Sequence, residues 1–358
     1  MARRVLLLNA TLNMGGAEKM IYNLARELAG EAHRGAVEPL VCSMSSGDDL
    51  ADDFRRADIP LRELVKPPGL RFDYALKLAA LLRRERIDVL HTHNFTPWLY
   101  GALAAAITPG CGLVHTQHSN VANNRPMPAP LRWLVNRVTS AIAPVSDPVA
   151  EHLVGEGYAS AAKTRTLFNG VPVGEPPAPR EGRFRFAIVA RLVAVKNHAF
   201  LLRSFARVCA EGGDVELHIV GDGPLMGELR ALSDELGLDG RVIFRGQAAD
   251  ASALLGEFDA LVLSSLSEGM SISILEGMAA GLPLVATDVG GNGMLVADGQ
   301  SGLLVPSEDE AAMSTALLAL AGDRELARQY GLTGHATARA RFSTAQMAAR
   351  YAALYAAA

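Results

Sequence analysis

Two glutamates with seven residues between them, Glu268 and Glu276, are the carboxylates of this sequence best placed to bind a ligand. Glu268 follows a buried-type apolar run and precedes Gly269, so we expect it in a loop at the carboxyl end of a strand. A carboxylate at such an edge can accept hydrogen bonds from ligand hydroxyl groups. Glu276 lies at the start of the next helix, where Ser273 and Glu276 also match the S-x-x-E capping box. Ligand binding and helix capping are both open interpretations of Glu276.

Two cations, Arg191 and Lys196, follow another buried-type run in the segment VARLVAVKNHAFLL. We expect Arg191 at the end of a strand and Lys196 at the start of the next helix, where the helix dipole disfavours a cation by about 0.3–1 kcal/mol. A bound phosphate would reverse that penalty, because both side chains and the dipole would then face the same anion. Two solvated surface charges are the alternative interpretation.

Gly15 and Gly16 lie between the first apolar run and a helical segment, in NMGGAEKM. Because glycine has no Cβ, backbone N–H groups there can approach an anion, although a tight strand-to-helix turn is the simpler interpretation. The sequence contains no GxxxxGK[ST], HExxH or Asp-x-Asp motif. It therefore gives no support to a P-loop, a zincin or a metal-dependent nucleotide-sugar site.

Two histidine pairs, His91 with His93 and His115 with His118, end neighbouring apolar runs. Histidines in this arrangement can bind a metal, but no acidic residue or cysteine stands beside them, so we predict no metal site. We expect His118 to be a hydrogen-bond donor or a polar wall for a ligand. Packing and capping account for the other three.

Composition restricts the class of protein. The chain has 358 residues, 49% of them hydrophobic, which is enough for two cores. Its net charge of -4 makes nucleic acid an unsuitable partner, and its 3 cysteines have no CxxC spacing for a disulfide framework or a thiolate metal site. The apolar run Val5 to Leu8 is too short for a signal peptide, and no run reaches membrane-spanning length. We expect a cytoplasmic protein, soluble or peripherally attached to the inner membrane surface.

Short apolar runs alternate with segments of helical period, a pattern that predicts α/β domains with parallel sheets. The predicted strands of the first half are RVLLLNA, EPLVCSM, DVLHTH, GLVHTQH and SAIAPVS. Those of the second half are FRFAIVA, VELHIVG, RVIFRG, ALVLSS and PLVAT. Each half begins with a strand, a loop and a helix, so we predict two doubly wound domains with a ligand site in the cleft between them.

The predicted domains are an N-terminal, acceptor-side domain over residues 1–171 and a C-terminal, nucleotide-sugar domain over 184–341. The segment 172–183 is rich in proline, glycine and charge and is predicted to be a linker. Residues 342–358 are predicted to form a terminal helix that docks back toward the N-terminal domain.

A basic amphipathic segment in the first half contains Arg125, Arg132 and Arg137 around Trp133. Such a helix can lie on an anionic bilayer, so we consider a weak peripheral membrane contact. An ordinary half-buried helix is the simpler alternative.

Taken together, several ordered motifs resemble glycosyltransferase family 4, whose members are retaining enzymes with the two-Rossmann GT-B fold. These motifs are NMGGAEK, Ala-Arg191 with Lys196, GDGP, Glu268 with Glu276, AAGLPLVATDVGG and DGQSGLLVP. The resemblance spans nearly the whole chain and is densest over residues 183–306. Three positions depart from the usual pattern: Ala190 replaces glycine, Gly277 replaces alanine, and Met294 replaces a glutamate.

The resemblance implies a role for each candidate residue. Arg191 and Lys196 would bind the pyrophosphate of a nucleotide sugar, helped by the backbone of Gly15 and Gly16. Glu268 would bind sugar hydroxyls, and Glu276 the ribose. His118 would lie near the sugar, the Gly246 region would flank the base, and amides would come from Met270, Ser271, Ile272 and Ser273.

The function implied is a hexosyltransferase-type enzyme (EC 2.4) that moves a sugar from a nucleoside-diphosphate donor, with UDP favoured, to a glycan, lipid-linked or small hydroxyl acceptor. Fixed cations at the leaving diphosphate would make a metal dispensable, and no cofactor is expected. A phosphorylase or nucleotide-sugar epimerase of the same fold, or a non-catalytic nucleotide-sugar sensor, remain alternatives.

Overall fold

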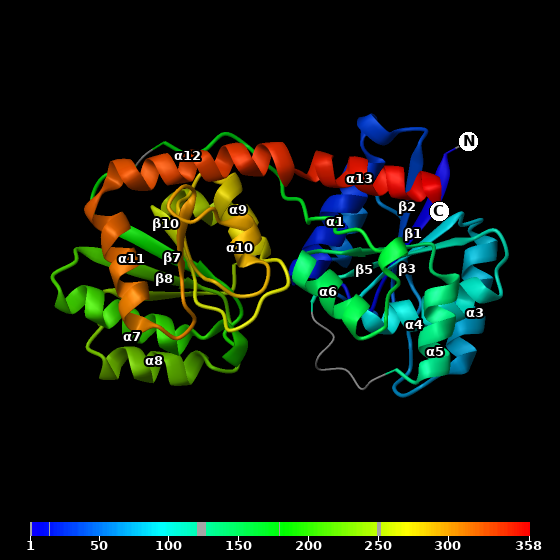
Figure 1. Ribbon diagram of the computed structural model, residues 1–358, viewed down its shortest axis with the longest axis horizontal. Helices are drawn as coiled ribbons and strands as arrows, with labels where there is room; N and C mark the ends of the chain where they lie inside the picture. Colours follow the sequence, from blue (N-terminus) through cyan, green and yellow to red (C-terminus); the bar gives the residue numbers. More distant parts are fainter. Residues whose placement is uncertain (1, 14, 120–126, 179, 249–251) are drawn as a thin grey trace. The chain divides into compact units, whose positions relative to one another are not determined.

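The computed structural model describes residues 2–13, 15–119, 127–178, 180–248 and 252–358, which form two compact units (Figure 1). The first unit is Met1–Gly170 with Thr344–Ala358, and the second is Val171–Ser343. Arg125, one of the basic residues of the amphipathic segment, lies outside the described residues.

The first unit contains a six-stranded parallel sheet of order β3-β2-β1-β4-β5-β6. Its strands are β1 (Arg3–Asn9), β2 (Val37–Ser43), β3 (Leu61–Glu63), β4 (Val89–His93), β5 (Gly112–Gln117) and β6 (Ala141–Pro144). Its helices are α1 (Gly16–Ala29), α2 (Ala51–Arg56), α3 (Phe72–Arg84), α4 (Phe95–Ala106), α5 (Ala129–Val138), α6 (Asp147–Gly155) and α13 (Thr344–Ala357).

Helices cover both faces of this sheet, because successive side chains of a strand point to opposite faces. In β1, Leu6 and Leu8 join a core that includes residues of α3 to α6, whereas Val5 and Leu7 join a core formed with α1, α2 and α13. All four leucine and valine side chains are fully buried. A continuous apolar run in this chain therefore indicates a strand buried on both sides.

The last helix, α13, packs against α1 within the first unit. Met347, Tyr351 and Tyr355 are spaced by four residues and are buried on one side of α13. At its start, Thr344 Oγ1 donates a hydrogen bond of 2.6 Å to Glu27 Oε1 of α1. The helix is thus an integral part of the first unit's core.

The second unit repeats the architecture with a six-stranded parallel sheet of order β12-β11-β10-β7-β8-β9. Its strands are β7 (Phe184–Val189), β8 (Val215–Val220), β9 (Val242–Gly246), β10 (Ala260–Leu263), β11 (Leu284–Thr287) and β12 (Gly302–Val305). Its helices are α7 (His198–Ala210), α8 (Met226–Glu235), α9 (Ile272–Ala279), α10 (Asn292–Leu295), α11 (Glu310–Gly322) and α12 (Arg324–Arg341).

The prediction of two doubly wound α/β domains with parallel sheets is confirmed, and each of the ten predicted strands is present. Two short strands, β3 and β12, escaped prediction. Two of the three residues of β3 are partly buried and the third, Glu63, is exposed, so β3 lacks the apolar run that identified the others. The segment 172–183 packs on the second unit, where His335 Nε2 of α12 hydrogen-bonds the carbonyl oxygen of Gly174 at 2.8 Å.

Helix α12 approaches the backbone that follows α9 so closely that only glycine fits at position 331. A Cβ on Gly331 would overlap the carbonyl oxygen of Gly281. We expect Gly331→Ala to lower the free energy of unfolding by about 1–3 kcal/mol, because backbone must move to admit the methyl group. Urea unfolding of the purified variant measures this change.

Gly227→Ala is the matched control, because Gly227 lies in helix α8 and a Cβ there would meet no atom within 4 Å. Alanine should stabilise that helix by up to about 1 kcal/mol. Equal stabilities of the two variants would contradict the close approach of α12.

Candidate functional site

Three loops at the carboxyl edge of the second sheet are tied to one another by hydrogen bonds. Between the loops after β10 and β7, Ser264 Oγ donates to the carbonyl oxygen of Lys196 at 2.8 Å, and the Leu266 amide donates to that of Val195 at 2.8 Å. From the end of β11, Thr287 Oγ1 donates to the carbonyl oxygen of Ser265 at 2.7 Å. The candidate residues on these loops are therefore held in fixed relative positions.

The side chains of Lys196 and Glu268 form an ion pair at the centre of these loops. Lys196 Nζ lies 2.6 Å from Glu268 Oε1, which also accepts a 2.6 Å hydrogen bond from Ser265 Oγ. Only 26% of the lysine side chain and 10% of the glutamate side chain is exposed. Glu268 is therefore a counter-ion for Lys196 within the protein, and Lys196 ends the short 3-10 turn Ala194–Lys196 before α7 begins at His198.

Glu268 keeps one oxygen for another ligand. Its Oε2 has no hydrogen-bond partner in the described part of the chain, because the two recorded bonds both go to Oε1. The position of its backbone is fixed by Gly290, which has φ +55° and whose Cβ would overlap the carbonyl oxygen of Glu268. Gly290, the first residue of the double glycine, is therefore a steric requirement of the Glu268 loop.

Arg191 is the exposed cation of this edge. It lies two residues after the end of β7, and its side chain makes no hydrogen bond or ion pair with any described residue. The GDGP loop packs against the adjacent backbone: a Cβ on Gly221 would overlap the carbonyl oxygen of Ala190, and one on Gly223 would lie 2.5 Å from that of Leu192. A free guanidinium on a tightly packed loop is available to an anion.

Ser271 is the N-cap of helix α9, and its Oγ accepts a long, 3.4 Å hydrogen bond from the Ile274 amide. The capping-box interpretation of Ser273 and Glu276 is wrong, because Ser273 lies inside the helix and donates to the carbonyl oxygen of Val189 at 2.7 Å. Within the described ranges, the amides of Ile272 and Ser273 have no acceptor. These two N–H groups therefore remain open at the start of α9, after the buried Met270.

Glu276 is buried in α9, with 8% of the residue exposed, and its Oε1 accepts a 3.1 Å hydrogen bond from Ser252 Oγ. The next residue, Gly277, allows α9 to lie against the sheet, because a Cβ would stand 2.8 Å from Leu261 and 3.0 Å from Leu284. Gly277, where alanine was expected, therefore has a packing explanation. Gly246 ends β9 with φ +71°, and its carbonyl oxygen accepts from the Gly221 amide at 2.8 Å.

The glycines of the first unit lie beside a carboxylate. Gly15 is the N-cap of α1, Gly16 is its first residue, and a Cβ on Gly15 would overlap Glu18 Oε2. Asn9 at the end of β1 donates a 3.0 Å hydrogen bond to Glu18 Oε1, and burial raises the pKa of Glu18. Sequence reasoning missed Asn9 and Glu18, although Glu18 follows directly in the NMGGAEK motif.

The four histidines occupy the two faces of the first sheet. His91, His93 and His118 lie on the face covered by α13: His91 Nδ1 is 2.7 Å from Tyr355 Oη, and its Nε2 is 2.8 Å from Thr116 Oγ1. His93 Nδ1 lies 3.1 Å from His118 Nε2. Burial lowers the pKa of His118 to about 4.

His115 points to the opposite face and stacks on Trp98, with ring centroids 3.9 Å apart and planes at 3°. Its Nδ1 is 3.1 Å from Thr92 Oγ1 and its Nε2 is 3.2 Å from Gln117 Oε1, so both ring nitrogens are satisfied. Among the residues that the structure describes, no group of three histidine, cysteine, aspartate or glutamate side chains is arranged to hold a metal ion.

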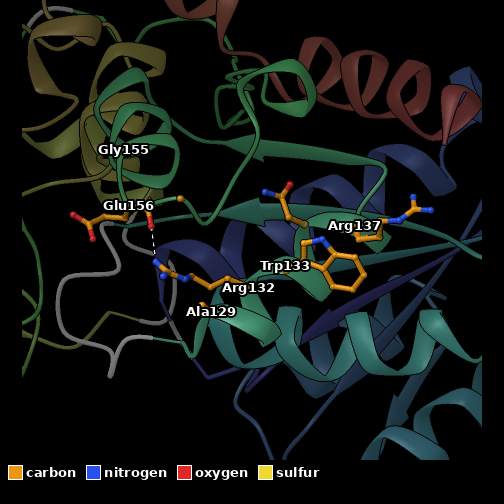
Figure 2. Close-up of a pocket in the computed structure, with 8 residues that line it drawn as sticks. Ala129, Arg132, Trp133, Arg137, Gly155 and Glu156 are labelled. Atoms are coloured by element: carbon orange, nitrogen blue, oxygen red, sulfur yellow. Dashed lines mark hydrogen bonds between the residues drawn. The ribbon is translucent and has the colours of Figure 1, made fainter.

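A separate hollow of about 620 Å³ lies between α5 and the end of α6 (Figure 2). Arg132 reaches toward Glu156 and donates to its carbonyl oxygen at 2.8 Å, while Trp133 and Arg137 lie along α5. The Trp133 side chain is largely exposed, and none of the predicted donor-site residues lines this hollow. No helix within the described ranges is long and apolar enough to span a bilayer.

Acid should destabilise the first unit through His115, because burial lowers its folded-state pKa to about 3 from an ordinary value near 6.5. Below about pH 6.5 the imidazole of His115 is protonated in the unfolded chain but stays neutral in the folded chain. The free energy of unfolding therefore falls as the pH falls. At pH 5 the loss from His115 should be about 2 kcal/mol, and His115→Gln should lack that part of the pH dependence. Urea unfolding at pH 7 and pH 5 measures both; identical slopes against pH would contradict the assignment.

Two family descriptions match the chain in sequence. Residues 14–175 match "Glycosyltransferase Family 4", and residues 183–323 match "Glycosyl transferases group 1". The two matches divide between the two units.

Curated relatives and solved structures agree with these matches. The chain is 30% identical to phosphatidyl-myo-inositol mannosyltransferase of Mycolicibacterium smegmatis, over 88% of this chain and 83% of the relative. It is 28% identical to the UDP-Gal:alpha-D-GlcNAc-diphosphoundecaprenol alpha-1,3-galactosyltransferase of Escherichia coli, over 70% of each. Anabaena HepE in complex with UDP has the same GT-B fold, with a TM-score of 0.85, 21% identity and 100% of both chains covered. The chain therefore belongs to glycosyltransferase family 4 and is a hexosyltransferase-type enzyme.

Proposed function

We propose that this enzyme transfers a sugar from a UDP-sugar to a hydroxyl group of an acceptor with retention of anomeric configuration, and that a lipid-linked acceptor is favoured over a free glycan or small molecule. One observation carries the proposal. Arg191 and the Lys196–Glu268 pair lie on hydrogen-bonded loops at one edge of the second sheet, and the open amides of Ile272 and Ser273 lie at the start of α9.

The cations would act on the leaving group. Breaking the anomeric bond places negative charge on the departing diphosphate, so groups fixed in position before the reaction stabilise the transition state most. Arg191 has no protein partner in the described chain, and Lys196 has two further N–H donors beyond its bond to Glu268. With the α9 amides they would supply the positive charge that a metal ion supplies elsewhere, so the proposed reaction needs no metal and no cofactor.

The carboxylates would hold the two sugars of the donor. Glu268 Oε2 would accept from hydroxyls of the transferred sugar, while Glu276 would bind the ribose and the Gly246 region would flank the base. Two of the similar proteins support uracil as that base, because the Escherichia coli relative uses UDP-Gal and a HepE structure contains UDP. His118, Gly15 and Gly16 of the first unit are assigned to the sugar and the diphosphate.

Retention would follow if the acceptor attacks from the face that the diphosphate leaves. The leaving phosphate would then take the acceptor's proton, because neither glutamate is assigned an acid–base role. This step distinguishes the reaction from glycoside hydrolysis by two carboxyl groups.

Exposed apolar and basic side chains of the first unit support an acceptor at a membrane. Trp133 of α5 is 66% exposed and Phe72 of α3 is 68% exposed, and α4 contacts both helices in one layer of the first unit (Figure 1). Arg132 and Arg137 provide positive charge beside Trp133. The relatives named above act on diphosphoundecaprenol-linked and phosphatidyl-inositol acceptors. The enzyme would therefore be cytoplasmic and peripheral at the inner membrane surface.

Arg191→Ala tests the donor site. Removing this guanidinium should lower kcat/KM by about 100-fold or more, because its charge is needed most as the diphosphate leaves. Thermal stabilisation by a panel of nucleotide sugars first identifies the donor. Release of the nucleoside diphosphate is then measured with a lipid-linked acceptor, and NMR of the product gives its anomeric configuration.

Arg207→Ala is the matched control, because Arg207 is an exposed arginine in the last turn of α7 and should leave turnover unchanged. Wild-type turnover of Arg191→Ala at saturating donor would remove Arg191 from the proposed mechanism. Stabilisation by no nucleotide sugar would count against the donor site as a whole.

Trp133→Ser tests the membrane surface. The indole is mostly in water, so its loss should cost little stability but should reduce co-sedimentation with anionic liposomes several-fold at low salt. Leu332→Ser, an exposed apolar residue of α12, is the control and should sediment like the wild type. Absence of the wild-type protein from anionic liposome pellets would exclude this contact.

A further inference from the structure

The number of hydrogen-bonded ring nitrogens separates the histidines in and directly after β4 and β5 into two kinds. His91 and His115 each have partners for both ring nitrogens. His93 and His118 are bonded to each other by one nitrogen apiece, while His93 Nε2 and His118 Nδ1 are buried and have no partner in the described chain. Buried polar atoms without partners cost about 1–3 kcal/mol each, so a ligand that pairs with them gains that free energy. His91 and His115 therefore have no ring nitrogen left for a ligand, whereas His93 and His118 each have one.

The hydrogen bond between the two neutral imidazoles links the tautomer of His93 to the tautomer of His118. Burial lowers the pKa of His118 to about 4 and that of His93 well below its ordinary value, so each ring carries one N–H at neutral pH. If His93 Nδ1 donates, His118 must hold its proton on Nδ1. If His118 Nε2 donates, His93 must hold its proton on Nε2. Both rings therefore always have the same tautomer, and their outer nitrogens present one donor and one acceptor.

We propose that His93 is a positioning residue of this enzyme, which holds the ring of His118 and couples its tautomer to its own, so that the tautomer of His93 decides whether His118 Nδ1 donates to a donor-sugar hydroxyl or accepts from it. The inference rests on the proposed role of His118 at the donor sugar. The backbone of His118 is also held in position, because its amide donates a hydrogen bond to Asn94 Oδ1 at 3.2 Å. The two rings are stacked at 29° with centroids 5.4 Å apart.

Residues of helix α13 contact the side chains that pack against His93. The ring of His91 lies 4.1 Å from that of His93 and is itself held by Tyr355, while Tyr351 Oη lies 2.9 Å from Thr116 Oγ1. Thr116 is the partner of His93 in the sheet register. His93 therefore has packed neighbours behind it and His118 beside it, which restricts its ring to one orientation.

The test compares His93→Leu with His93→Asn. Leucine removes the bond to His118, whereas asparagine places an amide near the position of Nδ1 and can donate or accept. We expect His93→Leu to lower kcat by about 10-fold, the value of one hydrogen bond of about 1.4 kcal/mol, and His93→Asn to recover most of that loss. Nitrogen-15 NMR of histidine-labelled protein without donor should show equal tautomers for His93 and His118, and mixed tautomers for His118 in His93→Leu.

The matched control is His115→Gln, a buried histidine of β5 on the opposite face, which should lose stability but leave the tautomer of His118 and the kcat unchanged. Opposite tautomers of His93 and His118, or a His93→Leu enzyme with wild-type kcat and KM, would overturn the inference. The variant His118→Ala distinguishes a failure of the His93–His118 coupling from a failure of the proposed function. Full activity of His118→Ala would remove His118 from the donor site, whereas an impaired His118→Ala beside a fully active His93→Leu would count against the coupling alone.

Discussion

The ion pair of Lys196 and Glu268 is the interaction on which the candidate site depends. Withdrawing a lysine and a glutamate from water costs several kcal/mol per ion unless each is paired and hydrogen-bonded. Here the pair forms across the loops after β7 and β10, and Ser265 adds a third group to the same oxygen. Because the loops are also joined by backbone hydrogen bonds, Arg191 is presented on a framework that is ordered before a ligand arrives.

A similar argument applies to the polar ends of the first sheet. The side chains that follow the apolar parts of β4 and β5 are buried, and most of them satisfy one another across the strand register. His115 is fixed by Thr92, Gln117 and Trp98, whereas His93 and His118 leave one nitrogen each. The incomplete hydrogen bonding stands out because the surrounding polar groups are so well paired.

The apolar runs were sufficient to predict ten of the strands, because strands buried on both faces need continuous apolar sequence. Motif spacing also placed Arg191, Lys196 and Glu268 at one sheet edge. It could not reveal that Lys196 and Glu268 bind each other, because 72 residues separate them and their contact depends on the order of β7 and β10 in the sheet. The helix start was misjudged for a local reason: Ser271 and Ser273 both precede the apolar run of α9, and only the contact of Ser273 with Val189 distinguishes them.

The connectivity of the two units has a consequence for biosynthesis. The second unit, Val171–Ser343, is inserted between α6 and α13 of the first, and its two ends are bridged by a hydrogen bond of 2.9 Å from the Val171 amide to the Phe342 carbonyl oxygen. A ribosome therefore completes the inserted unit before it delivers Tyr351 and Tyr355, the residues that close the core over His91. Until α13 emerges, that face of the nascent sheet is covered by α1 and α2 alone, and the apolar surface that α13 buries stays exposed during translation.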